Sequence, residues 1–273
     1  MEQQKFIEWK EKIIALQMEN QVTIPDGGGD IEQLRNLCVA FADDLRGSID
    51  FAGFFPDPII LEGVVAWANA PVFLCGVQGK ELAWLQQRLS EHKQLVTIPG
   101  DSKYWALRKV WKGACFIDIA REWIFRMVCI PGFIPPLSLA DEVRLYNDFL
   151  QYLNFFSHSS TQDSFVCGVL AYYASRHEYY EDVKRWVEKS PDNDKVIYSM
   201  LEQFPEAKFI HLTRASTPSS IYLARSNQEQ LGSERYRIIA YEDFLDNEEN
   251  TFNGIFDFLK IRTEHHLKMK ISE

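Results

Sequence analysis

The sequence has no long apolar run, and several other signals are missing as well. No stretch of about 18 apolar residues occurs, so no membrane-spanning helix is predicted. The amino terminus, MEQQKFIEWK, lacks the charged-then-apolar order of a signal peptide. A surplus of positive charge is also missing, because the 273 residues carry a formal net charge of −10. These absences argue against a membrane span, a secretory leader, and a nucleic-acid or anionic-membrane partner.

The cysteines show no spacing typical of a metal site or a redox pair. The five cysteines are widely spaced, and they form neither a CxxC pair nor a metal-ligand spacing. They stand in apolar contexts, as Cys38, Cys75, Cys115, Cys129 and Cys167. We therefore expect reduced core thiols, no metal site and a cytoplasmic location. No internal repeat or coiled-coil pattern is evident.

The composition that remains is that of a globular protein, with 46% hydrophobic and 25% charged residues. The length suits one sizeable α/β domain or two small ones. We expect residues 1–69 to form a helical segment packed on the core, with helices over 2–19 and from Asp30 through Leu45. Residues 70–261 are predicted to form the main domain, with a helical insertion at about 103–180. Residues 262–273 read as a polar tail.

The most informative stretch runs from Trp186 to Arg214. It holds a lysine in a Ser-Pro turn, Lys189-Ser190-Pro191, then an amphipathic helical segment, then the apolar strand 208–212 closed by Thr213-Arg214. An arginine after such a strand places a positive charge at the carboxyl edge of a sheet, where open α/β folds bind ligands. The planar guanidinium fork suits a phosphate, because it can donate two parallel hydrogen bonds.

This stretch resembles the sulfotransferases that use 3'-phosphoadenylyl sulfate (PAPS). Their bacterial and tyrosylprotein-type members read roughly W-x-x-K-[ST]-P, then F-P-x-A-K-F-I-h-L-x-R. The resemblance implies an α/β fold of the P-loop-like kind, with a central parallel sheet and helices on both faces. It also implies PAPS as the donor, adenosine 3',5'-bisphosphate as its product, and no metal. In that family's pattern Lys189 would act on the bridging oxygen of the donor and Arg214 would hold the 3'-phosphate.

A second likeness, with altered chemistry, lies at the front of the main domain. Residues 70–76 read as a buried strand that enters a loop and then a helix over 82–89, the layout of a phosphate-binding loop. The family reads roughly V-F-x-x-G-x-x-R-S-G-T-T here, and its arginine, serine, glycine and two threonines fall on Gly79, Lys80, Glu81, Leu82 and Ala83. The frame is kept from Gly76 onward, but the hydroxyl donors are lost and Glu81 stands where an anion should bind.

The loop therefore permits several interpretations. It binds PAPS through its backbone amides and Lys80, it binds another anion, or it binds nothing and the chain is a pseudoenzyme. A purely structural turn from strand to helix is a further alternative. The resemblance makes the candidate nucleotide-binding residues of this loop Gly76, Gln78, Gly79, Lys80, Glu81 and Leu82.

Two residues are candidates for the general base. Gly100-Asp101 falls where the family has Gly-Glu near the acceptor, although the shorter Asp101 can equally N-cap a helix that starts at Ser102. His177 lies among tyrosines in the predicted insertion and is either an acid/base residue or a structural one.

After Arg214 the family has a serine on the 3'-phosphate, and this position is Tyr222 here. Thr217-Pro218 predicts a helix start, with Ser219 and Ser220 in the first turn. Residues 235–245 read as the last core strand followed by Tyr-Glu-Asp. The predicted function is transfer of a sulfuryl group from PAPS to a hydroxyl or amine of a small molecule. The alternative is an inert or repurposed sulfotransferase-like protein that binds a ligand or partner.

Overall fold

The computed structural model describes residues 3–19, 31–51, 66–77, 79–101, 116–129, 137–156, 165–166, 168–170, 172, 182–215 and 219–263. The chain divides into two compact units, one made of residues 1–61 and 104–178 and the other of residues 62–103 and 179–273. Each unit is thus assembled from two separated parts of the chain. Within the described residues, no helix is both long enough and apolar enough to cross a membrane.

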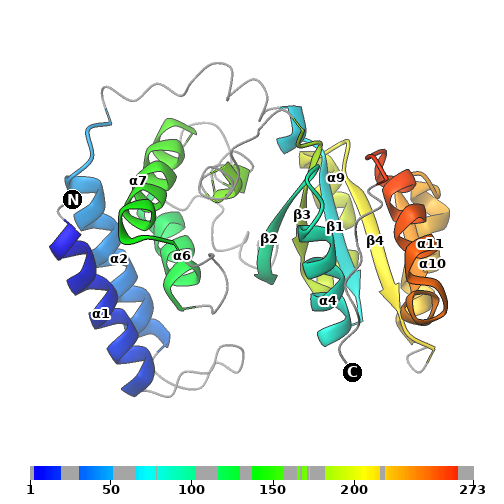
Figure 1. Ribbon diagram of the computed structural model, residues 1–273, viewed down its shortest axis with the longest axis horizontal. Coiled ribbons are helices and arrows are strands. Elements are labelled where there is room, and N and C mark those ends of the chain that lie inside the picture. Colours follow the sequence, from blue (N-terminus) through cyan, green and yellow to red (C-terminus); the bar gives the residue numbers. More distant parts are fainter. Residues whose placement is uncertain are drawn as a thin grey trace. The chain divides into compact units, whose positions relative to one another are not determined.

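The first unit is helical (Figure 1). Its described helices are α1 (Gln3–Glu19), α2 (Ile31–Gly47), α6 (Phe116–Cys129) and α7 (Leu139–Phe156). Rings from three of them form one buried cluster, in which the Phe6 ring lies 5.4 Å from Phe41 and 5.1 Å from Tyr146. The helix predicted over 2–19 is confirmed. The two amino-terminal helices therefore pack with helices from the predicted insertion.

The second unit contains a five-stranded sheet in which every described pairing is parallel. The strand order is β2-β3-β1-β4-β5 (Figure 1). The strands are β1 (Pro71–Gly76), β2 (Leu95–Asp101), β3 (Arg185–Lys189), β4 (Lys208–Thr213) and β5 (Tyr236–Ala240). The predicted α/β fold with a central parallel sheet is confirmed.

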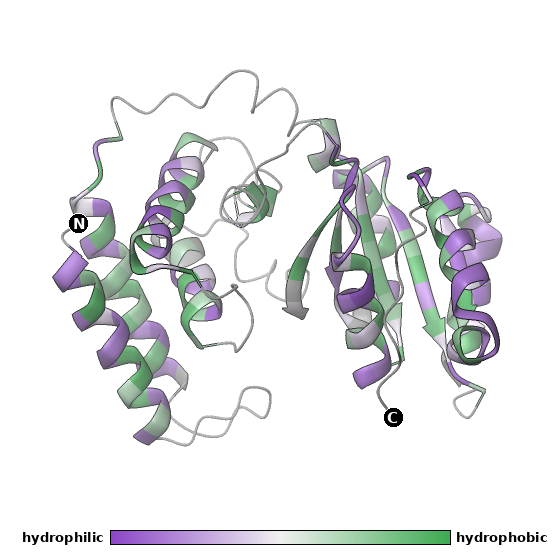
Figure 2. Ribbon diagram, in the orientation of Figure 1, coloured by the Kyte–Doolittle hydropathy of each residue, from purple (hydrophilic) through white to green (hydrophobic). Residues whose placement is uncertain are grey.

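One face of the sheet packs against helices α4 (Lys80–Ser90) and α11 (Tyr241–Leu259). The buried cluster between them consists of aliphatic residues of the strands and of α4, joined by phenylalanines of α11. Figure 2 shows the cause: the strands are mainly hydrophobic along their length, whereas α4 and α11 carry both hydrophobic and hydrophilic residues. A helix that is apolar on one side only buries that side against a sheet.

The opposite face is aromatic. The Phe73 ring of β1 lies within 6.0 Å of the Trp186, Phe204 and Phe209 rings. The short helix η1 (Pro191–Lys195) contacts β1 on this side, and α10 (Ser219–Leu231) contacts η1, β4 and β5. Helix α9 (Ile197–Gln203) buries Ile197 and Met200. Helices thus cover both faces of the sheet, so a ligand site is sought at the ends of the strands.

Candidate functional site

The carboxyl ends of β3, β1 and β4 are neighbours in the sheet. Lys189 is the last residue of β3 and is paired in register with Leu74 of β1, while Gly76 at the end of β1 is paired with Leu212 of β4. Arg214 directly follows β4. From β1 the chain goes to β2 and β3 on one side of it, and it then crosses to β4 and β5 on the other side. The topological switch point of the sheet therefore lies beside β1. In open parallel sheets this is the place where ligands bind.

The loop after β1 depends on two glycines. Gly76 has φ of 106°, and a Cβ there would lie 2.2 Å from the carbonyl oxygen of Leu212, so no side chain fits. The next amide, of Val77, donates to that same carbonyl across 3.0 Å. Gly79 has φ of 135° and is the N-cap of α4. The turn therefore holds the backbone tightly against β4 before the helix begins.

The other residues predicted to bind a nucleotide at this loop lie in different environments. Lys80 is the exposed first residue of α4. The side chain of Leu82 is buried in the core between α4 and the sheet, so it cannot contact a ligand at the loop. Gln78 lies outside the described residues. Helix α4 begins two residues before the predicted start at 82.

Glu81, the second residue of α4, is paired with the arginine at the end of β4. Its Oε1 lies 3.1 Å from Nη1 of Arg214, and its side chain is only 7% exposed, against 46% for the arginine. Its Oε2 lies 3.0 Å from the point where a Cβ on Gly79 would be. The carboxylate is thus folded back over the first turn of the helix, where the unpaired amides and the helix dipole favour negative charge.

Lys189 is held by the turn that follows it. The neighbouring Glu188 is fully buried and accepts hydrogen bonds from Ser190 Oγ (2.6 Å) and Asn193 Nδ2 (2.5 Å). The amide of Ser190 donates to the carbonyl of Leu74 in β1 (3.2 Å). These bonds fix the Ser-Pro turn against β1, so that Lys189, 9% exposed, is kept at the edge.

Asp101 comes to the same edge from β2. Its backbone is paired in register with Lys189, after an irregular stretch between Thr97 and Asp101 in which β2 gains extra residues over β3. Gln86 of α4 donates from Nε2 to the carbonyls of Ile98 and Gly100 and so holds this bulge. The structure therefore brings Asp101 and Lys189 to adjacent positions in the sheet.

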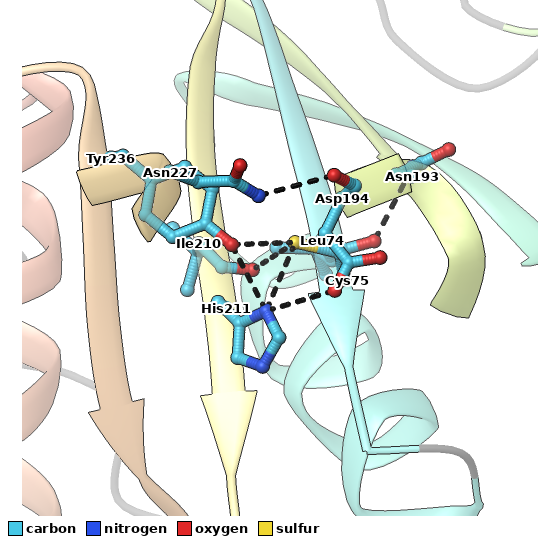
Figure 3. Close-up of polar contacts among 8 residues, drawn as sticks. All are labelled: Leu74, Cys75, Asn193, Asp194, Ile210, His211, Asn227 and Tyr236. Carbon is cyan, nitrogen blue, oxygen red and sulfur yellow. Dashed lines mark hydrogen bonds and ion pairs between the residues drawn. The ribbon is translucent and has the colours of Figure 1, made fainter. Parts of the chain in front are cut away.

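A buried polar cluster lies on the aromatic face, one residue below the end of β1 (Figure 3). Nδ1 of His211 is 3.0 Å from the Tyr236 hydroxyl, 3.5 Å from Asp194 Oδ2 and 3.7 Å from Cys75 Sγ. The Cys75 and Asp194 contacts both fall on the same nitrogen, so the imidazole cannot relay a proton from thiol to carboxylate. Burial lowers the pKa of His211 to about 4 and raises that of Cys75 well above its usual range. The imidazole and the thiol beneath the loop are therefore uncharged.

The segment after Arg214 contacts a second carboxylate, from α11. Oε1 of Glu242, in the first turn of α11, accepts a hydrogen bond from the amide of Ala215 (3.1 Å). A helix follows as predicted, since α10 is described from Ser219 onward, while Thr217 and Pro218 lie outside the described residues. Tyr222 lies in the first turns of α10 and is 75% exposed. His177, the other candidate base, lies outside the described residues.

Sequence reasoning missed two features of this site. The strand β3 was not predicted, because its Glu188 is a charged residue in the interior of a sheet. His211 was counted as one residue of an apolar strand. A polar residue in the middle of the run KFIHLT was the available signal, since such a residue needs partners when it is buried.

Among the described residues, no group of three or more His, Cys, Asp or Glu side chains could hold a metal ion. No protein-family model matches the sequence. No curated protein matches it either. Among solved structures, the fold is similar to the crystal structure of the sulfotransferase STF1 from Mycobacterium tuberculosis, with a TM-score of 0.43 and 12% sequence identity. That likeness covers 97% of this chain and 85% of the other.

Proposed function

We propose that this chain transfers a sulfuryl group from PAPS to a hydroxyl or amine of a small molecule. One observation carries the proposal. The strand order puts Lys189, at the end of β3, and Arg214, after β4, on either side of the glycine loop that follows β1. Two fixed cations around a backbone loop at a sheet edge are suited to a ligand with separated anionic groups.

In this proposal the donor's 5'-phosphosulfate binds at the loop, on Lys80 and on the amides of Gly76, Gly79 and Leu82. Arg214 holds the 3'-phosphate. The sulfur–oxygen bond to the bridging oxygen breaks while the acceptor's oxygen or nitrogen bonds to sulfur, and adenosine 3',5'-bisphosphate leaves. Lys189 stabilises the charge that builds on the bridging oxygen, which lowers the barrier because that charge is largest in the transition state.

The acceptor loses a proton in this reaction, and Asp101 is the proposed base. Its backbone lies next to Lys189 in the sheet, so the two groups would serve opposite ends of the transferred sulfuryl group. His177 remains a second candidate for this role, and Tyr222 a candidate contact to the 3'-phosphate. No metal takes part in the proposed chemistry.

A second candidate function is binding without transfer. The ion pair between Glu81 and Arg214 favours it, because this pair places a negative charge in the loop and engages the arginine proposed for the 3'-phosphate. A chain of this kind would hold a ligand or partner at the same edge and would not turn over PAPS.

The test measures binding and transfer separately. Adenosine 3',5'-bisphosphate at 100 times its Kd should add about 2.7 kcal/mol to the free energy of unfolding, seen as a rise in Tm. Transfer is then followed with labelled PAPS and a panel of phenols, alcohols and amines. Stabilisation without transfer supports the second candidate, and neither stabilisation nor transfer, in the natural chain or its Glu81→Gln variant, refutes both.

The variant Lys189→Met tests the catalytic role. It keeps the unbranched stem of the side chain and removes the ammonium, so we expect transfer to fall at least a hundredfold (about 2.7 kcal/mol) while the Kd for the bisphosphate changes much less. The matched control is Lys184→Met, since Lys184 is an exposed lysine just before the other end of the same strand. Equal losses in both variants would contradict the assignment.

A further inference from the structure

The loop after β1 already contains an anion, and that anion belongs to the chain itself. Glu81 lies in the first turn of α4, almost fully buried, and its partner cation Arg214 directly follows β4, 133 positions further along the chain. An N-terminal helix turn and an arginine are the groups that would receive a phosphate or sulfate from a ligand. This carboxylate engages the arginine through Oε1, and its Oε2 lies beside the N-cap Gly79, 3.0 Å from the point where a Cβ would be.

A second observation, from the opposite side of the loop, also indicates that an oxyanion is accommodated there. Nε2 of His211 has no hydrogen-bond partner among the described residues, and the ring is fully buried. It lies 3.0 Å from the point where a Cβ on Gly76 would be, so it abuts the first residue of the loop. In Figure 3 this nitrogen is directed toward the carboxyl end of β4.

We assign the proton of the neutral ring to Nε2. The Tyr236 hydroxyl is 3.0 Å from Nδ1 and is placed to donate its proton to that nitrogen. The imidazole is neutral, because burial lowers its pKa. A neutral ring that accepts at Nδ1 carries its proton at Nε2. A buried N–H without an acceptor is costly, and an oxygen arriving at the loop would remove that cost.

We propose that Glu81 is an internal anion that determines which ligands the loop accepts. A ligand's phosphate or sulfate must exchange with the Glu81 carboxylate on Arg214 and on the first turn of α4, and the rearranged loop then gives His211 Nε2–H an acceptor. The inference rests on the proposed function only in taking this loop as the donor's site. It adds that the natural chain binds oxyanions weakly until Glu81 is displaced or neutralised.

The decisive variant is Glu81→Gln, which keeps the shape of the side chain and removes its charge. The matched control is Glu91→Gln. Glu91 is the residue that follows α4, and its carboxylate pairs with Arg88 at 2.6 Å, so the control removes the same charge from the other end of the helix. Binding is measured by titration calorimetry with two probes, inorganic sulfate and adenosine 3',5'-bisphosphate.

We expect Glu81→Gln to bind both probes at least tenfold more tightly than the natural chain, a difference of about 1.4 kcal/mol. Glu91→Gln should bind as the natural chain does. A gain in affinity does not arise from misfolding, so this result separates an internal anion from a merely structural residue. Equal or weaker binding by Glu81→Gln, or no binding of either probe, overturns the inference. Tighter binding of sulfate alone supports the exchange but contradicts a nucleotide as the occupant.

The histidine provides a second readout, by ¹⁵N NMR of the imidazole nitrogens. Sulfate added to Glu81→Gln should move the His211 Nε2 resonance. The His92 ring should not respond, because its Nε2 contacts the Arg262 carbonyl and its Nδ1 accepts from the Gln94 amide. An unmoved His211 signal in the sulfate-bound variant contradicts the loop rearrangement. If affinity rises but labelled PAPS is never turned over, the exchange stands and the proposed transferase function fails.

Discussion

Replacing His211 by glutamine is expected to remove a pH dependence of stability that the buried cluster creates. Three groups contact the ring directly: Cys75 of β1, Asp194 of η1 and Tyr236 of β5. A fourth, Asn227 of α10, acts through Asp194 and Tyr236. Asp194 is the group that would favour a charged imidazole. Burial outweighs it, and the pKa of His211 falls from about 6.5 to about 4.

The sign of the effect follows from where the proton binds. Between pH 6.5 and pH 4 the unfolded chain takes up a proton on this histidine and the folded chain does not, so acid favours unfolding. The contribution is fully present above about pH 6.5 and is lost as the pH falls toward 4. A difference of about 2.5 in pKa corresponds to about 3 kcal/mol, at 1.36 kcal/mol for each pKa unit.

Urea unfolding of the natural chain and of His211→Gln, at half-unit steps from pH 7 to pH 4, measures this contribution. The carboxylates that do not contact the ring titrate in the same way in both proteins and cancel in the difference. We expect the natural chain to lose about 3 kcal/mol of its free energy of unfolding relative to His211→Gln as the pH falls from 7 to 4. Parallel curves across the whole range would refute the argument that the ring is held neutral by burial.

Two further substitutions test the frame of the site. Gly76→Ala should destabilise the second unit by about 2 kcal/mol or more, because the new Cβ would meet the Leu212 carbonyl at a positive φ. The control Gly47→Ala should be nearly neutral, because nothing lies within 4 Å of the new Cβ. Equal falls in the urea midpoints of the two variants would contradict this. Glu188→Gln puts an amide donor against Asn193 and should cost about 1–3 kcal/mol; an unchanged midpoint would show that the buried carboxylate does not hold the turn after Lys189.

The sequence predicted the elements that carry a regular pattern. The strands β1 and β4 are mainly apolar, as expected for parallel strands buried on both faces, and both were placed correctly. Helix α4 begins two residues earlier than predicted, because Gly79 provides the N-cap and Lys80 then starts the helix ahead of its apolar residues. Local pattern and turn chemistry were sufficient for these elements.

The pairings across the site could not be predicted in the same way. The sequence analysis predicted no distant partner for Glu81, whereas the structure pairs it with Arg214, which only the fold brings near. Glu188 looks unsuited to a central strand until Ser190 and Asn193 are seen to bond it. A long-range partner leaves no mark in local sequence, so charged residues at a sheet edge can be located from sequence but not paired.

The most direct test of the central claim is a crystal structure of Glu81→Gln with adenosine 3',5'-bisphosphate. The account predicts the 5'-phosphate at the loop 76–80, with the ammonium of Lys189 on one side and the 3'-phosphate against Arg214 on the other. A nucleotide bound away from the carboxyl ends of β1, β3 and β4, or no bound nucleotide at millimolar concentration, would contradict it.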